Sequence, residues 1–301
     1  MKMYRLIGLL LSIIMTVPAA FASTGGSDQG IFVPGRFMSM AGAADGSVYL
    51  LDDKHQLVCV KPDGSQATIA LPRIQESKAA DRLCDLAVDG RTIAFCGFAF
   101  PVIFTLDLDK PESFQITRAS DQESASLHLL NISRDASGWR VRDADGLVFK
   151  MQHARPISRL PEFSALEADE NGKVILMPPP RNENGLMIAG RVQKEDGRLL
   201  WVAPVPTAPR QVMSVDFLGF DKAGCHNFVV MTASGELNPE FTVYAVRRGQ
   251  VVASGKIPGP AGLEMQHFCR LSPDGSILYA QAAPEKESGI FLKKLKLTKA
   301  N

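Results

Sequence analysis

Leu271-Ser-Pro-Asp-Gly-Ser-Ile-Leu-Tyr-Ala280 is the stretch that indicates the fold. A short apolar segment precedes an Asp-Gly turn signal, and a second segment rich in apolar residues follows it. Glycine suits this turn because a tight hairpin that matches the twist of its strands needs a positive backbone φ. The stretch therefore predicts two antiparallel strands joined by a short turn.

Weaker copies of this unit recur along the chain. Each of six copies has a glycine at its first turn, namely Gly46, Gly90, Gly138, Gly172, Gly224 and Gly275. In the first five copies two more strand-like segments follow the hairpin, which gives four short strands per copy. Recurrence at about 40–50 residues is the signature of a propeller, in which each copy forms one antiparallel sheet. An irregular β-sandwich with coincidental turns is the alternative.

The sixth copy contains only three strand-like segments. Several other copies end in an apolar residue followed by proline, which a sheet tolerates at its outer edge. One segment of this type remains unassigned, Ile31-Phe-Val-Pro34, near the N-terminus. We therefore expect Ile31–Val33 to pair with Ile290–Leu297. The predicted fold is an all-β, six-bladed β-propeller closed by an N-terminal strand.

Two of the copies resemble known propeller blades. Ser272-Pro-Asp-Gly-Ser-Ile-Leu-Tyr279 resembles the blade motif of TolB-like propellers. Leu86-Ala-Val-Asp-Gly-Arg-Thr-Ile-Ala94 is similar to blades of NHL-type and SMP-30/gluconolactonase-type propellers. The resemblance covers nearly all of the mature chain at the level of spacing, and it implies the β-propeller superfamily without indicating a particular member.

The N-terminus has the pattern of a cleaved signal peptide. A basic start precedes the apolar run Leu6–Val17, and Ala20-Phe-Ala22 supplies small residues for cleavage. The run is too short to span a bilayer as a helix, and no later stretch is long and apolar enough to do so. We expect residues 1–22 to be removed, which leaves residues 23–301 as a single domain in the periplasm or outside the cell.

The charge of the chain argues against nucleic acid as a partner. The formal net charge is +1, and removal of Lys2 and Arg5 with the signal peptide leaves −1. Nucleic-acid binding depends on neutralising phosphates with Lys and Arg, so a near-neutral chain lacks that footprint. The basic cluster of Lys293, Lys294, Lys296 and Lys299 is interpreted as a solvated strand end, with a binding patch as the alternative.

All five cysteines lie in the mature chain, which we expect to meet oxidising conditions. Cys84 and Cys96 flank the turn of the second copy at similar distances and are the disulfide candidate. The register of the two strands decides whether they face each other. Cys225 and Cys269 form a weaker candidate pair, and Cys59 is interpreted as a small buried hydrophobe.

The first strand of each copy is expected to line a central channel, and its polar residues are candidates for ligand binding. The candidates are Asp85, Asn131, Glu167, Asp216 and His267, together with His128. Asp85 and Glu167 both stand five positions before a turn glycine, so we expect them to point the same way. Carboxylates and amides suit Ca²⁺. The resemblance to lactonase-type propellers also implies a channel metal, although the equivalent positions in copies one and six are Ala41 and Arg270.

Catalytic signatures such as G-x-S-x-G, H-E-x-x-H and the P-loop do not occur in the sequence. The leading hypothesis is a monomeric, non-enzymatic scaffold that binds a protein or small-molecule ligand and needs no cofactor. Polar connections between strands, such as Pro178–Gly185, offer surface for such binding. The rival hypothesis is a metal-dependent lactonase or lyase-like hydrolase with a channel Ca²⁺. The sequence leaves open whether the protein is an enzyme.

Overall fold

The structure is a computed structural model, and every regular element in its described residues is a β-strand. The described residues are 30–72, 83–97, 102–118, 129–135, 138–143, 148–150, 158–160, 165–169, 172–177, 186–193, 199–206, 211–233, 239–248, 250–258, 265, 267–284 and 288–300. Within these ranges no helix is long and apolar enough to cross a membrane. The predicted signal peptide, residues 1–22, lies outside them.

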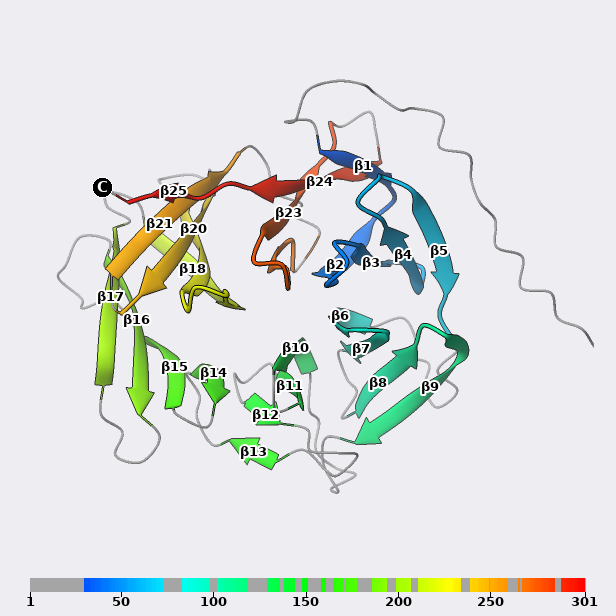
Figure 1. Ribbon diagram of the computed structural model, residues 1–301, viewed down its shortest axis with the longest axis horizontal. Coiled ribbons are helices and arrows are strands. Elements are labelled where there is room, and N and C mark those ends of the chain that lie inside the picture. The colour runs from blue at the N-terminus through cyan, green and yellow to red at the C-terminus, as the bar shows by residue number, and fades with distance from the viewer. Residues whose placement is uncertain are drawn as a thin grey trace, which may run out of the picture.

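The strands form six antiparallel sheets that stand around a common centre, as the blades of a propeller do (Figure 1). Blade 1 contains β2 (Phe37–Gly42), β3 (Val48–Asp52), β4 (Gln56–Val60) and β5 (Gln66–Ala70). Blade 2 contains β6 (Leu83–Asp89), β7 (Thr92–Gly97), β8 (Val102–Asp107) and β9 (Lys110–Arg118). Blade 3 contains β10 (Leu129–Asp135), β11 (Gly138–Asp143), β12 (Val148–Lys150) and β13 (Ser158–Leu160).

The remaining blades follow the same plan, with the first strand nearest the centre and the fourth at the rim (Figure 1). Blade 4 contains β14 (Ala165–Asp169), β15 (Gly172–Met177), β16 (Leu186–Gln193) and β17 (Leu199–Pro206). Blade 5 contains β18 (Gln211–Phe220), β19 (His226–Ala233), β20 (Glu240–Arg247), β21 (Gln250–Ile257) and β25 (Thr298–Lys299). Blade 6 contains β22 (Cys269–Leu271), β23 (Ile277–Ala282), β24 (Gly289–Leu295) and β1 (Ile31–Pro34).

The hairpin that indicates the fold forms as its sequence predicts. Gly275 has a φ of +87°, in the left-handed region that glycine adopts without strain. Asp274 accepts hydrogen bonds from the backbone nitrogen of Ser276 at 2.9 Å and from its hydroxyl at 2.6 Å. These bonds lower the pKa of Asp274 to about 2. The turn is therefore held by its own aspartate, which explains why Asp-Gly marks it.

The sixth sheet is completed by the N-terminal strand. β1 pairs antiparallel with β24, with Val33 opposite Ile290 and Ile31 opposite Leu292. Val33 is fully buried, and Phe32 stacks against Phe291 with ring centroids 5.3 Å apart. The expected pairing of residues 31–33 with the last long strand is therefore present, and one blade is built from both ends of the chain (Figure 1).

The C-terminal residues add a feature that the sequence did not indicate. After β24 the chain leaves blade 6 and pairs with the rim strand of blade 5, where Lys299 stands opposite Ala253 and Thr298 opposite Ser254. A Cβ on Gly255 would lie 3.1 Å from the Leu297 side chain, so glycine permits this close approach. β25 thus covers part of the edge of blade 5 and links it to blade 6.

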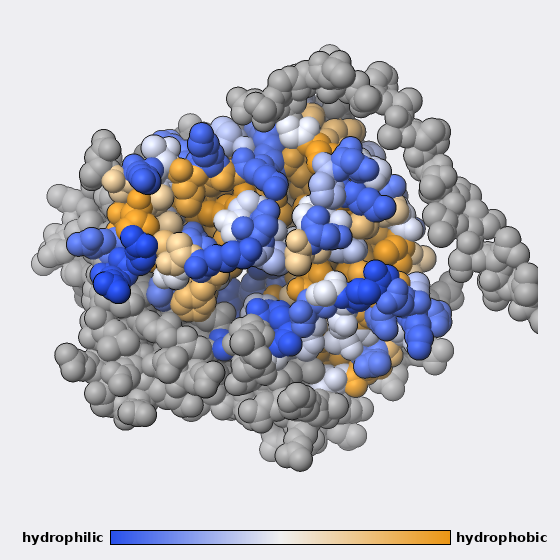
Figure 2. All heavy atoms as spheres, in the orientation of Figure 1, coloured by the Kyte–Doolittle hydropathy of each residue, from blue (hydrophilic) through white to orange (hydrophobic). Residues whose placement is uncertain are grey.

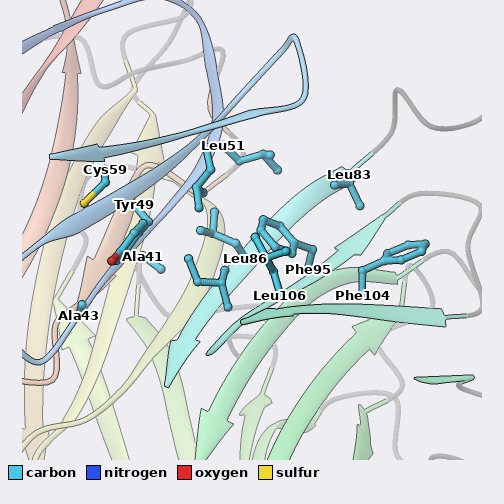
Figure 3. Packing of buried hydrophobic residues seen from close by; sticks show 12 residues of the cluster. Ala41, Ala43, Tyr49, Leu51, Cys59, Leu83, Leu86, Phe95, Phe104 and Leu106 are labelled. Atoms are coloured by element: carbon cyan, nitrogen blue, oxygen red, sulfur yellow. The ribbon is translucent and has the colours of Figure 1, made fainter. Parts of the chain in front are cut away.

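Apolar side chains fill the space between neighbouring blades. Between blades 1 and 2, for example, Leu51 and Leu57 pack in one cluster with Leu86, Phe95 and Phe104. Figure 3 shows part of this cluster, with Leu51 near Leu86 and Phe95. Each of these five residues has at most 1% of its surface exposed to solvent. The other face of blade 2 packs against blade 3 in a second cluster that includes Ile103 and Leu129. Both faces of blade 2 are therefore apolar, and this blade needs a neighbour on each side. A closed ring of blades satisfies this requirement.

Deleting residues 23–34 should therefore destabilise the mature protein. The deletion removes β1 and exposes the edge of β24 with its buried side chains, which corresponds to several kcal/mol of lost core packing. We expect the melting temperature to fall by about 10 °C, since each kcal/mol shifts it by about 2–4 °C in a chain of this size. The control deletion of residues 23–29 spares β1 and should leave the melting curve unchanged. Equal curves for both deletions would contradict the closure.

Candidate functional site

The first strands of five blades share a bulge next to a polar residue. Where each first strand pairs with the second, the register shifts by one residue, between Phe37 and Ser39, Leu83 and Asp85, Leu129 and Asn131, Ala165 and Glu167, and Val212 and Ser214. A bulge re-aims the side chain that follows it. In blade 6, His267 precedes the first strand and forms a parallel bridge with Ser39.

Asp85 is the centre of the polar cluster that these strands create. Its side chain is fully buried. The Ser39 hydroxyl of blade 1 donates to Oδ1 at 2.5 Å, the Leu86 nitrogen donates to the same oxygen at 2.9 Å, and the Ile132 nitrogen of blade 3 donates to Oδ2 at 2.9 Å. Arg270 of blade 6 donates its Nη2 to Oδ1. One carboxylate therefore joins four blades.

The charge of Asp85 is balanced by an arginine. Burial is the largest single influence and acts to raise the pKa of this carboxyl, but the positive charge of Arg270 and the hydrogen bonds from Ser39 and Arg270 act together to hold the pKa below its ordinary value. Arg270 also donates its Nε to the carbonyl oxygen of Met40 at 3.2 Å. Asp85 is thus ionised, and its counter-charge is supplied by the chain itself.

This arrangement does not fit a Ca²⁺ site at Asp85. Calcium needs six to eight oxygen ligands with free lone pairs. Both carboxylate oxygens of Asp85 already accept hydrogen bonds, and Arg270 supplies the cation. Among the described residues, no group of three or more His, Cys, Asp or Glu side chains is placed to hold a metal ion.

His267 forms a second link across the channel. Its Nε2 lies 3.0 Å from the carbonyl oxygen of Leu130, and its Nδ1 lies 3.3 Å from Nδ2 of Asn131. The Asn131 Oδ1 accepts bonds from Arg142, from Nε at 3.2 Å and from Nη2 at 2.6 Å. Since Arg142 fixes the amide oxygen, Nδ2 of Asn131 must face His267 and donate to it. His267 is therefore neutral, with its proton on Nε2, and burial lowers its pKa.

Arg142 extends the cluster to blade 5. Its Nη2 lies 3.6 Å from Oδ1 of Asp216. The Asp216 side chain is 46% exposed, in contrast to the buried Asp85, so this pair is the solvated end of the cluster. We call the connected residues Ser39, Asp85, Asn131, Arg142, Asp216, His267 and Arg270 the axial network. Figure 2 shows hydrophilic residues around the centre of one face of the ring.

Four of the channel residues predicted from the sequence belong to the axial network, namely Asp85, Asn131, Asp216 and His267. The backbone of Glu167 follows the bulge of blade 4, as Asp85 does in blade 2, but its side chain and all of His128 lie outside the described residues. In blade 5 the bulge is followed by Ser214, and Asp216 stands two residues farther on.

The sequence pattern did not identify Ser39 or Arg142, and the equivalence of Ala41 with Asp85 is wrong. That equivalence assumes a constant distance from the turn glycine, but the turns differ in length. Five residues separate β2 from β3, whereas two separate β6 from β7. The polar residue near the start of each first strand was the usable signal. Arg270, which had looked like a gap in a metal site, is the partner of Asp85.

The candidate disulfide between Cys84 and Cys96 is not formed, and all five cysteines are free and buried. The bulge between Leu83 and Asp85 takes Cys84 out of the strand register, so Cys96 stands opposite Asp85. The Cys84 thiol instead lies 3.2 Å from the carbonyl oxygen of Leu129 in blade 3. Cys225 and Cys269 are likewise unbonded.

No protein-family model and no curated protein matches the sequence. Similar solved structures include the hydrazine synthase of Kuenenia stuttgartiensis, with 12% identity, a TM-score of 0.49, and 86% of this chain and 76% of that chain covered. The WD40 β-propeller domain of Doa1 has 9% identity and a TM-score of 0.49, with 91% and 94% covered. YCF48 bound to D1 peptide has 11% identity and a TM-score of 0.47, with 89% and 85% covered.

These likenesses are too distant to indicate an activity or a partner. The fold assignment rests instead on the chain's own six sheets and their arrangement around one centre (Figure 1). This chain is a β-propeller.

Replacing Asp85 with alanine should destabilise the protein strongly. The change leaves the Arg270 charge without its partner in the interior, and breaking a buried ion pair in this way costs about 3–5 kcal/mol. Urea denaturation would measure the loss. Asp63→Ala is the matched control, because Asp63 is an exposed turn residue whose carboxylate accepts local hydrogen bonds from Ser65 in the same turn. If both variants lost the same small amount, the axial network would not stabilise the fold.

Proposed function

We propose that this protein is an exported, non-enzymatic scaffold that binds a protein or small-molecule partner on the exposed connections of its ring. The observation that carries the proposal is the state of the axial network: its inner polar groups are buried and bonded to one another. Groups that already satisfy each other in this way are poorly placed to bind or transform a substrate.

The pattern of hydrogen bonds in the network also argues against a hydrolase. Ser39, His267 and Asp85 are the residue types of a hydrolase triad, and they lie close together. In a triad the histidine accepts the serine proton and the carboxylate orients the histidine. Here the Ser39 hydroxyl donates directly to Asp85, while Nε2 of His267 faces the Leu130 carbonyl oxygen. Ser39 therefore lacks the contact with a histidine base that activates the serine of a triad.

Binding is then left to the two faces of the ring. Successive strands of a blade run in opposite directions, so the turns at the two ends of β4 lie on opposite faces. Lys54, in the turn before β4, and Asp63, in the turn after it, are both exposed. Loops carried on a rigid scaffold are the usual place for recognition. We propose residues 23–301 as one monomeric domain, with residues 1–22 directing it to the periplasm or the exterior.

Site-specific photo-crosslinking tests the binding role and identifies the face that is used. A crosslinking residue placed at Lys54 samples one face, and the same residue at Asp63 samples the other, so each is the control for the other. In the exporting cell we expect a discrete adduct from one position and not from both. Lack of an adduct at either position, together with lactone hydrolysis that Asp85→Asn abolishes, would contradict the scaffold and favour the enzyme.

Calcium should leave the stability of the protein unchanged. A ligand that binds the folded state at 100 times its Kd stabilises it by about 2.7 kcal/mol, which would raise the melting temperature by about 5–10 °C. Because the Asp85 oxygens are already bonded, we expect the same melting temperature in millimolar CaCl₂ and in EDTA. A calcium-dependent rise that Asp85→Asn removes would restore the metal-dependent alternative.

A further inference from the structure

His267 lies in the blade that closes the ring. It lies just before β22, a first strand of only three residues, in the blade that both ends of the chain complete. Its ring holds the Leu130 carbonyl oxygen and the Asn131 amide of blade 3, and its backbone bridges Ser39 of blade 1. The position of β22 relative to blade 3 therefore depends in part on this side chain.

The hydrogen bonds around His267 accept only the neutral ring. Nε2–H donates to Leu130, and Nδ1 accepts from Asn131, whose amide is held in that orientation by Arg142. A second proton on Nδ1 would point at a donor rather than at an acceptor. Asn131 cannot turn its oxygen toward the ring without losing both bonds from Arg142.

The charged groups around His267 do not offer an easy alternative. Asp85 has an oxygen 3.8 Å from Nε2, but that carboxylate is already paired with Arg270, which would repel a second cation. Arg142 does not contact the imidazole directly, because it binds the Asn131 oxygen that lies between them. Asp216 is on the far side of Arg142, and 46% of its side chain is exposed to water. With the ring 7% exposed, water cannot readily solvate the added charge.

We propose that His267 is an acid-sensitive latch, and that its protonation releases the segment leading into β22 from blade 3 and loosens the closing blade. The proposal does not depend on the scaffold function. At neutral pH the ring is uncharged and the latch is closed. Acid must either break the bonds to Leu130 and Asn131 or leave a buried charge without an acceptor.

The direction of the pH dependence follows from linkage. The folded protein holds the pKa of His267 below the ordinary value of 6.5, so in acid the unfolded or released state binds more protons. The contribution of His267 to stability is complete above about pH 6.5, the pKa of an unperturbed histidine. It falls as the pH drops below that value toward the lower pKa of the closed state.

Hydrogen exchange with mass spectrometry tests the latch. We compare protection factors at pH 7.5 and pH 5.0 for peptides covering β22 and β20, which lies in the interior of blade 5. We expect the protection of β22 to fall severalfold at pH 5.0 relative to pH 7.5, because the released state binds the extra proton. β20 should stay protected, because it has a strand on each side.

Three variants decide between the latch and general acid unfolding. His267→Gln carries no titrating group and should remove the difference between the two pH values. Asn131→Asp places an acceptor at Nδ1, so the charged ring becomes favoured and β22 should keep its protection at pH 5.0. His55→Asn is the matched control, since His55 lies in a surface turn with a φ of +61° that asparagine tolerates, and it should behave as the parent does.

Either of two results would overturn the proposal. One is equal loss of protection in β20 and β22 of the parent protein at pH 5.0. The other is an acid-induced loss in β22 that persists in both His267→Gln and Asn131→Asp. If His267→Gln fails to fold, Asn131→Asp alone carries the test, because the latch predicts a gain of protection in that variant at pH 5.0.

Discussion

The buried carboxylate of Asp85 is the interaction on which the centre of the molecule depends. Removing such a group from water costs several kcal/mol unless hydrogen bonds and an opposite charge replace the water. Here the replacements come from four different blades, through Ser39, Leu86, Ile132 and Arg270. The burial of this carboxylate is therefore favourable only in the one arrangement of blades that supplies all of these partners, and it destabilises other arrangements.

The network is asymmetric although the blades are repeats. A bulge recurs at the start of five first strands, and the residue that follows it is polar but varies between blades: serine, aspartate, asparagine, glutamate and again serine. Repetition of the backbone supplies the positions, and divergence of the side chains supplies complementary donors and acceptors. Blade 6, which β1 completes, contributes two members of this network, His267 and Arg270. This blade is therefore held at the rim by β1 and near the axis by these two side chains.

Much of the fold was predictable because its signals are local. Turn glycines, alternating apolar segments and a stray apolar-Pro segment were enough to count the blades and to assign Ile31–Val33 to the last one. The short pairing of Thr298 with Ser254 was not predictable, because two residues at the end of a basic segment carry no pattern that names a partner strand. The polar types lining the channel were found, but their partners were not. Contacts such as Arg270 with Asp85 join residues 185 positions apart. The position of each side chain along its strand depends on bulges and turn lengths, which the spacing of glycines does not reveal.

The axial network is a structural lock rather than a chemical site, and a double-mutant cycle on Asp85 and Arg270 tests this most directly. The free energy of unfolding would be measured for the parent, Asp85→Ala, Arg270→Ala and the double variant. A lock predicts a coupling energy of about 2 kcal/mol or more, with the double variant far less destabilised than the sum of the single changes. Additive losses, with a coupling near zero, would show that the two charges do not hold the blades together and would contradict the account.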